Sequence, residues 1–222
     1  MNRFSALDDR LFRASALFPA CDYGADIGAD HGRLSCFLLE SGKVQRMCVA
    51  DISADSLKKA EALLADRGLH DRADFRVGDG LSVLDRPAGA ITILGMGGHT
   101  LCGILTEGQE KLQGATLILS AHTDMSLVRQ TLMELDYRIE KEEIAYAAKR
   151  FYVLLRAVPG QEALSEKQLS LGPRLMETYP THYLEYLQWR IGIAKKKQSP
   201  EGKQELNWLK EEEAHVRDGE NH

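Results

Sequence analysis

Residues 23–32 read YGADIGADHG and form the most informative stretch of the chain. A short β-type run stops at Asp26, and the chain then turns through Gly28 and Gly32 into a helical pattern. A strand that turns through glycine into a helix can hold an adenosyl cofactor, because glycine lets the backbone approach a ligand and the helix N-terminus presents free N–H groups. The stretch therefore predicts a cofactor site.

The same loop lacks the phosphate-binding pattern of dinucleotide folds. Ala29 and Asp30 follow Gly28, so G-x-G-x-x-G is absent, and a carboxylate beside a pyrophosphate would repel it. This argues against an NAD-dependent oxidoreductase, which we keep as the weakest alternative.

Two further β-type runs end in acidic residues. Asp51 follows the glycine turn at close to the roughly 20-residue spacing at which a carboxylate accepts hydrogen bonds from ribose hydroxyls. We group the adjacent Ile52 with it as a cofactor-binding candidate. Asp79, followed by Gly80, could accept from the exocyclic amine of an adenine. Solvated strand ends or tight turns use the same residue types, but the joint spacing of Asp26, Asp51 and Asp79 favours S-adenosylmethionine, which offers an amino group, a ribose and an adenine.

Glycine-rich and polar residues follow the next two β-type runs. GMGG at 95–98 indicates a close approach of backbone to a ligand or substrate, with a tight strand-to-helix turn as the alternative. SAHTD at 120–124 places His122 near the same edge, where it could orient a base or shuttle a proton, or lie in a surface loop.

Strand-like and helix-like segments alternate along the first part of the chain, which predicts right-handed βαβ units and a parallel sheet. Residues 137–147 and 149–158 are joined by too few residues for a crossover helix, so they should pair antiparallel. The earlier segments expected to be strands are 23–28, 46–52, 73–80, 90–97 and 116–121, and the expected helices are 1–18, 33–41, 54–67 and 124–135.

Pro159 and Gly160 mark a change in composition. Beyond them long charged side chains dominate, and apolar residues recur at helical spacing from Leu175 onward. We predict a sheet domain with an N-terminal helix over 1–160 and a helical hairpin over 161–222.

Composition bounds the class of protein. The 222 residues are 44% hydrophobic with a net charge of −5, which supports a sizeable core and argues against coating nucleic acid through bulk charge. The four cysteines form no C-x-x-C pair, which predicts reduced thiols and no metal site. The N-terminus has no continuous apolar run, so we expect a cytoplasmic protein without a membrane segment. We separately expect a monomer.

Taken together, DIGADHG, GDGL and GMGG, in this order and spacing, resemble the bacterial tRNA (adenine(22)-N(1))-methyltransferase (TrmK-like) family. LDDRLFRASALF near the N-terminus and LGPRLMETYP at 171–180 are similar to further parts of that family. The resemblance implies an α/β, Rossmann-like class I methyltransferase with a seven-stranded sheet, the last strand antiparallel, followed by a coiled-coil-like helical pair. It also implies methylation of adenine in tRNA with S-adenosyl-L-methionine.

The resemblance assigns roles to the motif residues. Asp26, Gly28, Asp30 and His31 would shape the methionine end of the cofactor site, Asp51 the ribose end, and Asp79 with Gly80 the adenine edge. Gly95, Met96, Gly97 and Gly98 would form the floor under the target base, with the first two also touching the cofactor. After the fifth strand the family usually has a Q-P-N-like segment, whereas this chain has Ser120, Ala121 and His122, so its adenine site departs from the family pattern.

A ring nitrogen of adenine needs no strong base to accept an activated methyl group, so alignment should dominate catalysis. We name Asp30 and His31 as catalytic candidates that tune the developing charge, and His122 as a further catalytic candidate. Two alternatives stay open: a non-catalytic S-adenosylmethionine-binding module, and a methyltransferase with another substrate. Contact with tRNA requires local cations. For each basic candidate the alternative is that it lies on a solvated helix face. The candidates are Arg3, Arg10, Arg13, Arg33 and Lys195, Lys196 and Lys197.

Overall fold

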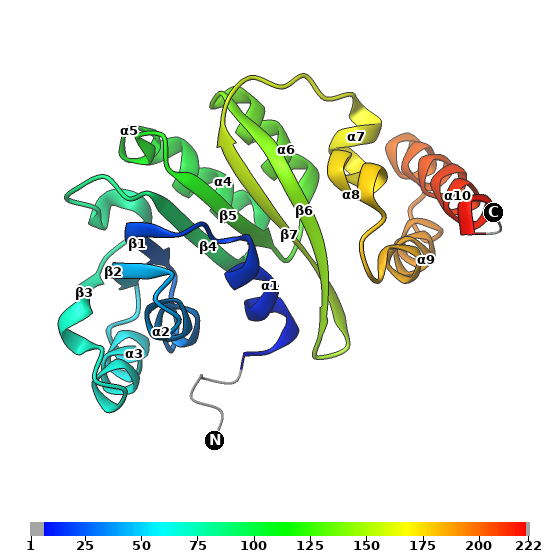
Figure 1. Ribbon diagram of the computed structural model, residues 1–222. Coiled ribbons are helices and arrows are strands. Elements are labelled where there is room, and N and C mark those ends of the chain that lie inside the picture. The colour runs from blue at the N-terminus through cyan, green and yellow to red at the C-terminus, as the bar shows by residue number, and fades with distance from the viewer. Residues whose placement is uncertain (1–6, 221–222) are drawn as a thin grey trace.

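The computed structural model describes residues 7–220, which form one seven-stranded sheet covered by helices on both faces, with a helical region at one edge (Figure 1). The strand order is β3-β2-β1-β4-β5-β7-β6. The strands are β1 (Cys21–Ile27), β2 (Val44–Asp51), β3 (Ala73–Val77), β4 (Ala90–Met96), β5 (Thr116–Ala121), β6 (Tyr137–Ala147) and β7 (Arg150–Pro159).

Strands β1 to β5 pair in parallel, as alternating strands and helices require. β7 runs antiparallel to both of its neighbours, β5 and β6. The predicted sheet, with its last strand antiparallel, is therefore confirmed. The third strand is shorter than expected, because the chain leaves the sheet after Val77 and Gly80 begins a 3-10 turn (Gly80–Val83).

The helices predicted over 33–41, 54–67 and 124–135 are present, and their ends follow local signals. The helix expected over 1–18 is present from Asp9, and residues 1–6 lie outside the described residues. Asp8 caps the first helix by accepting the Leu11 N–H at 2.9 Å, and Ser53 caps the helix after β2. A helix begins at Gly98, as the strand-to-helix alternative for GMGG requires. The helices are α1 (Asp9–Leu17), α2 (Arg33–Glu40), α3 (Ala54–Asp66), α4 (Gly98–Glu107), α5 (Gln109–Leu112), α6 (Met125–Glu134), α7 (Glu166–Leu171), α8 (Pro173–Thr178), α9 (Tyr183–Ala194) and α10 (Pro200–Glu220).

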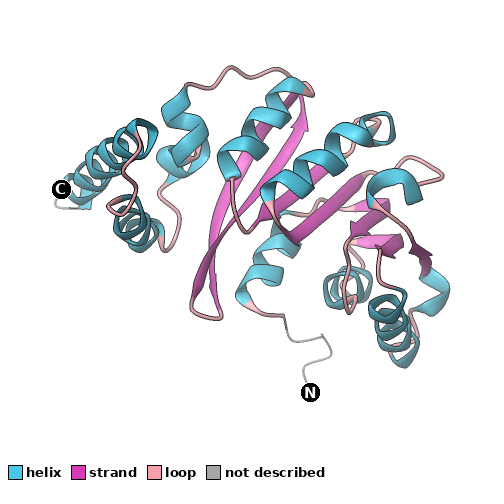
Figure 2. Ribbon diagram, turned by 180° about the vertical axis from the view of Figure 1, so that it is seen from behind, coloured by secondary structure: helices cyan, strands magenta, loops and turns pink. Residues whose placement is uncertain are grey.

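Helices cover both faces of the sheet (Figures 1 and 2), and an apolar layer lies beneath them on each face. One contains α1, α2 and α3, with Leu38 and Leu64 fully buried, and the other contains α4 and α6, with Leu101 and Leu132 fully buried. A third cluster joins the C-terminal helices to β6 and β7 through Ile144 and Val153. The C-terminal region therefore packs on the sheet, and the predicted division at residue 160 stays a prediction.

The joint between sheet and C-terminal region contains a buried ion pair. Arg129 Nε of α6 donates to Glu142 Oε1 of β6 at 2.8 Å, and both side chains are at most 1% exposed. Arg129 Nη1 also donates to the Leu169 carbonyl at 2.7 Å, and Glu142 Oε2 accepts the Arg174 N–H at 2.9 Å. The pair thus connects α6, β6, α7 and α8.

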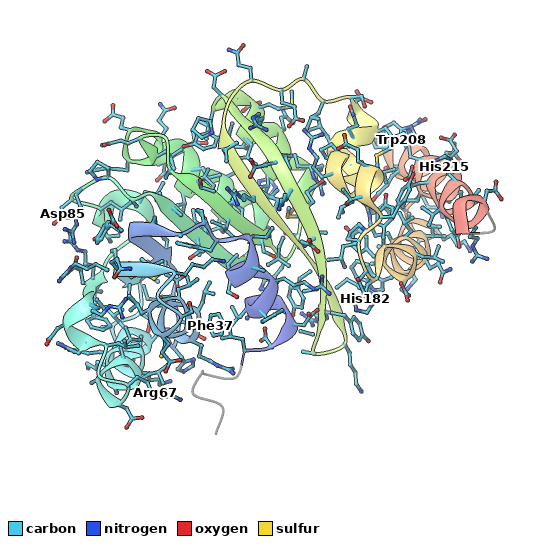
Figure 3. The ribbon with its side chains drawn as sticks, viewed as in Figure 1. Phe37, Arg67, Asp85, His182, Trp208 and His215 are labelled. Atoms are coloured by element: carbon cyan, nitrogen blue, oxygen red, sulfur yellow. The ribbon has the colours of Figure 1, made fainter. Side chains whose placement is uncertain are left out.

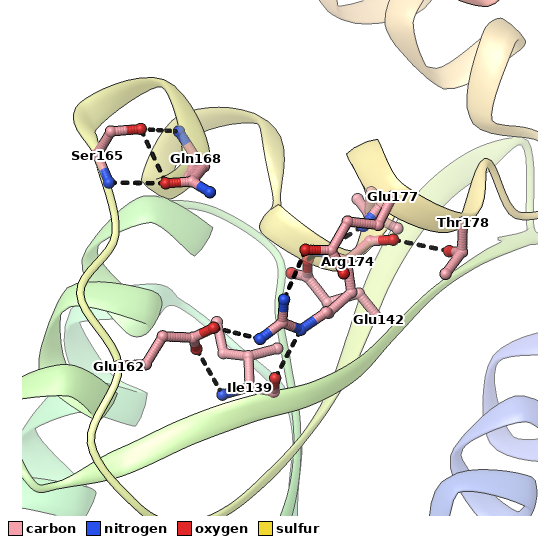
Figure 4. Close-up of polar contacts among 9 residues, drawn as sticks. Ile139, Glu142, Glu162, Ser165, Gln168, Arg174, Glu177 and Thr178 are labelled. Carbon is pink, nitrogen blue, oxygen red and sulfur yellow. Dashed lines mark hydrogen bonds and ion pairs between the residues drawn. The ribbon is translucent and has the colours of Figure 1, made fainter.

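Neighbouring contacts extend this joint (Figure 4). Arg174 Nε donates to the Ile139 carbonyl at 2.8 Å, and its guanidinium also contacts Glu162. A Cβ at Gly172 would lie 2.8 Å from Arg129 Nη2, so the turn between α7 and α8 passes the ion pair too closely for a side chain. This explains a glycine within LGPRL.

Removing one partner of this pair should destabilise the protein strongly. Glu142→Ala leaves the Arg129 charge buried and uncompensated, which we expect to lower the free energy of unfolding by about 3–5 kcal/mol in urea denaturation. Asp55→Ala, which removes the exposed pair with Lys58, is the matched control and should change it little. Equal stability of the two variants would contradict the role given to Glu142.

Candidate active site at the carboxyl edge of the sheet

The predicted site residues gather where strands β1 to β5 end. The order β3-β2-β1-β4-β5 places consecutive chain connections on opposite sides of the β1 and β4 pair, so a topological switch point lies between them. Ligands of open α/β sheets bind in the crevice outside such a point. The loops after β1 and β4 meet there: a Cβ at Gly28 would lie 2.7 Å from Met96 Cε.

The loop after β1 is held tightly against β2. The N–H groups of Gly28 and Ala29 both donate to the Ala50 carbonyl at 2.9 Å. Gly32 begins α2 with φ +66°, and a Cβ there would lie 2.7 Å from the Ala60 Cβ of α3. Glycine at this position is therefore required both by the left-handed backbone and by the closeness of α3.

Asp51 connects this loop to the start of α3. Its Oδ2 accepts the Asp30 N–H at 2.9 Å, and its Oδ1 accepts the Ser53 N–H at 2.8 Å. A carboxylate oxygen has two acceptor positions, so both oxygens keep capacity for a ligand hydroxyl. The predicted ribose contact is compatible with this arrangement.

Asp26 lies inside the sheet rather than on its rim. Ser35 Oγ donates to its Oδ2 at 2.6 Å, Thr92 Oγ1 donates to its Oδ1 at 2.8 Å, and the residue is buried. Burial raises the pKa of the Asp26 carboxyl, partly offset by these two hydroxyl donors. The carboxylate braces α2 and β4 behind the site, and its predicted contact with a cofactor stays a prediction.

Apolar residues flank the acidic positions Asp51 and Asp79, of which Asp51 is half-buried and Asp79 exposed. Ile52 is 71% exposed beside Asp51, and Val77, which pairs with Asp51 in the β2–β3 register, is 59% exposed. Asp79 is exposed in the next turn, and Gly80 has φ +53°. Exposed apolar side chains next to acceptor groups suit a flat heteroaromatic ring that needs both a packing surface and a hydrogen-bond partner.

GMGG has two structural roles. A register shift between β4 and β5 at Leu94 and Met96 leaves Gly95 exposed with φ +78°. Gly97 is half-buried, with Thr123 Oγ1 3.8 Å from the place of its missing Cβ. Gly98 is buried, and a Cβ there would lie 2.7 Å from the Thr123 carbonyl. Packing thus accounts for Gly98, whereas Gly95 offers open backbone at the crevice, and contact of either with substrate stays a prediction.

Three side chains from distant elements surround Gly95. Arg10 Nη1 of α1 and His122 Nε2, just after β5, lie 3.5 and 4.0 Å from the position that a Gly95 Cβ would occupy. The Tyr152 ring of β7 lies 5.4 Å from Arg10 Cζ and meets the His122 ring edge-on, with centroids 5.7 Å apart. The sequence predicted Arg10 and His122 but missed Tyr152, whose only signal was an aromatic pair in a strand.

The remaining candidates are more dispersed. Asp30 Oδ2 and His31 Nδ1 are 2.9 Å apart on the exposed loop, and Asp30 has φ +51°. Arg33 is exposed at the start of α2. Arg13 pairs with Asp9 at 3.1 Å and with Glu143 at 3.1 Å.

The lysine candidates belong to the C-terminal region rather than to the strand edge. Lys195 and Lys196 are exposed at the end of α9, while Lys197 Nζ donates to Glu205 Oε2 at 2.7 Å. Lys197 is therefore paired with a carboxylate, unlike the unpaired cation that contact with tRNA would require. Arg3 lies outside the described residues.

Other properties of the described residues bear on the class of site. Within residues 7–220 no three His, Cys, Asp or Glu side chains are grouped so that they could hold a metal ion. In the same part of the chain, every helix is too short or too polar to cross a membrane. The four cysteines are unpaired, and three of them are buried. Burial raises the pKa of Cys48 to about 11.

The buried Asp26 carboxyl should make stability depend on pH. Its pKa is raised in the folded state, so the folded protein binds more protons than the unfolded chain above the ordinary value of about 3.9. The free energy of unfolding should therefore fall as pH rises through the raised pKa, and Asp26→Asn should flatten that slope in denaturant titrations across this window. Asp66→Asn, at the exposed end of α3, is the control; equal slopes for Asp26→Asn and wild type would contradict the interpretation.

Comparison with known proteins agrees with this geometry. The family model for tRNA (adenine(22)-N(1))-methyltransferase, TrmK, matches residues 24–217. The tRNA (adenine(22)-N(1))-methyltransferase of Bacillus subtilis (strain 168) is 30% identical over 172 residues, which cover 77% of this chain and 72% of the relative.

Solved structures share the fold over nearly the whole chain. The crystal structure of B. subtilis TrmK has a TM-score of 0.80 and 25% identity, covering 96% of this chain and 98% of that one. M. capricolum TrmK in complex with S-adenosyl-homocysteine has a TM-score of 0.81 and 22% identity, covering 92% and 96%. A Streptococcus agalactiae protein of the NADB-Rossmann superfamily has a TM-score of 0.87 and 26% identity, covering 95% and 98%. The chain described here belongs to the tRNA (adenine(22)-N(1))-methyltransferase family.

Proposed function

We propose that the crevice between the loops after β1 and β4 is where this protein carries out its family's reaction, S-adenosylmethionine-dependent methylation of adenine N1 in tRNA. The observation that carries the proposal is the meeting of these loops at the switch point, where Gly28 contacts Met96 and Asp51 holds Asp30. Family membership favours this enzyme over the alternatives of a non-catalytic module and a dehydrogenase.

The cofactor fits the residues of the edge. We propose that Asp51 accepts from ribose hydroxyls and that Asp79 with Gly80 meets the adenine edge. Ile52 and Val77 supply apolar surface for the ring. The loop Gly28 to His31 would hold the methionine end, with Asp26 bracing the loop from behind. When bound, this cofactor supplies a methyl group activated by a positively charged sulfur.

The residues of the chain would orient the adenine and offset the positive charge that develops on it. The N1 lone pair attacks without a general base, and methylation leaves a positive charge on the purine ring. We propose that the backbone of Gly95 and Gly97 supports the ring, and that Tyr152 and His122 limit its orientation. The Asp30 carboxylate, on the exposed loop after β1, offsets the charge.

Several finer features stay predictions within this proposal. The adenine at position 22 is the target named for the family. Arg10, Arg33, Lys195 and Lys196 are proposed to attract the phosphate backbone, because they carry positive charge on a chain that is acidic overall. We further propose that the protein acts as a monomer in the cytoplasm.

Transfer of labelled methyl groups to unmodified tRNA tests the function directly. Nucleoside analysis should show 1-methyladenosine, and a tRNA carrying guanosine at position 22 should not be labelled. Asp51→Ala should lose labelling together with S-adenosylhomocysteine binding, because it removes both the ribose acceptor and the bond that holds Asp30. Another labelled nucleoside, or none with the wild-type chain, would contradict the proposal.

Replacing Asp30 separates charge from loop geometry. Asp30→Asn tolerates the left-handed backbone and Asp30→Ala does so less well, yet both remove the carboxylate. We expect both to lower kcat by on the order of 10²-fold, the scale of losing one electrostatic contact in a transition state. S-adenosylhomocysteine affinity should fall much less, because both variants keep the backbone N–H of residue 30 that Asp51 holds. Wild-type turnover in Asp30→Asn would remove the carboxylate from the mechanism.

A further inference from the structure

A large cleft separates the C-terminal helices from the sheet domain. Its volume is about 1000 Å³, and it is bounded by the end of β5, the start of α6, β7, α7, α9 and α10. Four large aromatic side chains line it: Phe151 of β7, Tyr186 and Trp189 of α9, and Trp208 of α10, which is labelled in Figure 3. None of these residues has a role in the site described above.

Three of the aromatic rings form a connected surface. Tyr186 and Trp189 are stacked, with centroids 6.0 Å apart and planes 26° apart. Phe151 lies 5.9 Å from Trp189 and 6.0 Å from Tyr186. Trp189 is 46% exposed, and Ile193, one turn further along α9, is also exposed. An aromatic side chain exposed to solvent in a cleft can stack with any of the nucleobases.

The charges of the cleft favour a base over a phosphate. Its two basic lining residues share one carboxylate: Arg190 donates to Glu205 Oε1 at 2.6 Å and Lys197 donates to Glu205 Oε2 at 2.7 Å. Asp124, Glu166 and Glu201 add negative charge to the lining. A phosphate would be repelled here, whereas a neutral base could stack and donate its exocyclic amine to a carboxylate.

One end of the cleft is the edge of the proposed methylation site. Residues 121–124 line the cleft, and the same segment holds His122 beside Gly95 and packs Thr123 against Gly98. A nucleotide adjacent to an adenine at Gly95 would therefore reach the cleft through a connected surface.

We propose that this cleft binds the base of an unpaired nucleotide next to the target adenine, stacked on Trp189, with its phosphates outside. This inference rests on the proposed function and adds the substrate feature that the function leaves open. The RNA must then present at least two unstacked neighbouring nucleotides, so the enzyme recognises a splayed loop or bulge rather than a continuous helix.

The chain's two tryptophans both line the cleft, which allows a direct binding measurement. In Trp208→Phe, Trp189 is the sole tryptophan, and titration with unmodified tRNA should quench its fluorescence. Trp189→Ala in the full chain should raise KM for tRNA about 5- to 150-fold, the loss of one stacked base, with unchanged S-adenosylhomocysteine affinity. Trp189→Phe should restore most of the loss, because it keeps an aromatic face.

Tyr179→Ala is the matched control, since Tyr179 is similarly exposed and stacks on Tyr183 away from the cleft lining. Its KM for tRNA should match that of the wild type. Unchanged KM in Trp189→Ala, or a fluorescence of Trp189 indifferent to tRNA, would overturn the cleft proposal while leaving the function intact. If Trp189→Ala changed only the self-association of the protein in sedimentation, the cleft proposal would be overturned in favour of a contact between copies of the chain. Absence of methyl transfer by the wild type would overturn the proposed function, and the fluorescence titration would still decide the cleft.

Discussion

The buried carboxylate of Asp26 is the contact on which the geometry of the site depends. It accepts hydrogen bonds from Ser35 of α2 and Thr92 of β4, so one side chain joins β1 to both elements at the switch point of the sheet. A buried polar group with its acceptors satisfied favours one arrangement, because any shift of α2 or β4 would leave it unpaired. The loops that follow β1 and β4 are thereby held at the separation that the crevice requires, and Asp51 extends the same bracing to the end of β2.

The second constraint is the close approach of the loops after β1 and β4 to neighbouring elements, which glycine allows. The loop after β1 can lie against Ala60 only because Gly32 lacks a Cβ, and the loop after β4 can lie against Thr123 only because Gly98 does. Gly28 is favoured instead by its left-handed backbone, with φ +74°. The glycines of each motif are therefore explained by packing as well as by the approach of a ligand. The distinction matters for interpretation, since the exposed Gly95 is available to a substrate and the buried Gly98 is explained by its protein neighbours.

Two features join the C-terminal region to the sheet. The buried pair of Arg129 and Glu142 connects α6 and β6 to α7 and α8. The aromatic cleft begins at the same segment, 121–124, that borders the crevice. The crevice and the helical hairpin thus share a wall. Under the proposals above, an acidic protein would bind RNA with scattered cations outside and an aromatic surface inside.

The sequence by itself determined the parallel strands, the antiparallel closing pair and the placement of Gly28, Asp51 and Gly95 at one edge. These features follow from short-range patterns, since hydrophobic periodicity and strand-ending glycines act within a few residues and parallel strands must end together. Only the tertiary structure decided that Tyr152 lies beside Arg10 and His122, that the Asp26 carboxylate faces inward, and that Lys197 is paired. Such contacts join segments remote in the chain or on different helices. They depend on strand register, sheet twist and helix packing, which are set by the packing of the whole core and leave no local pattern in the sequence.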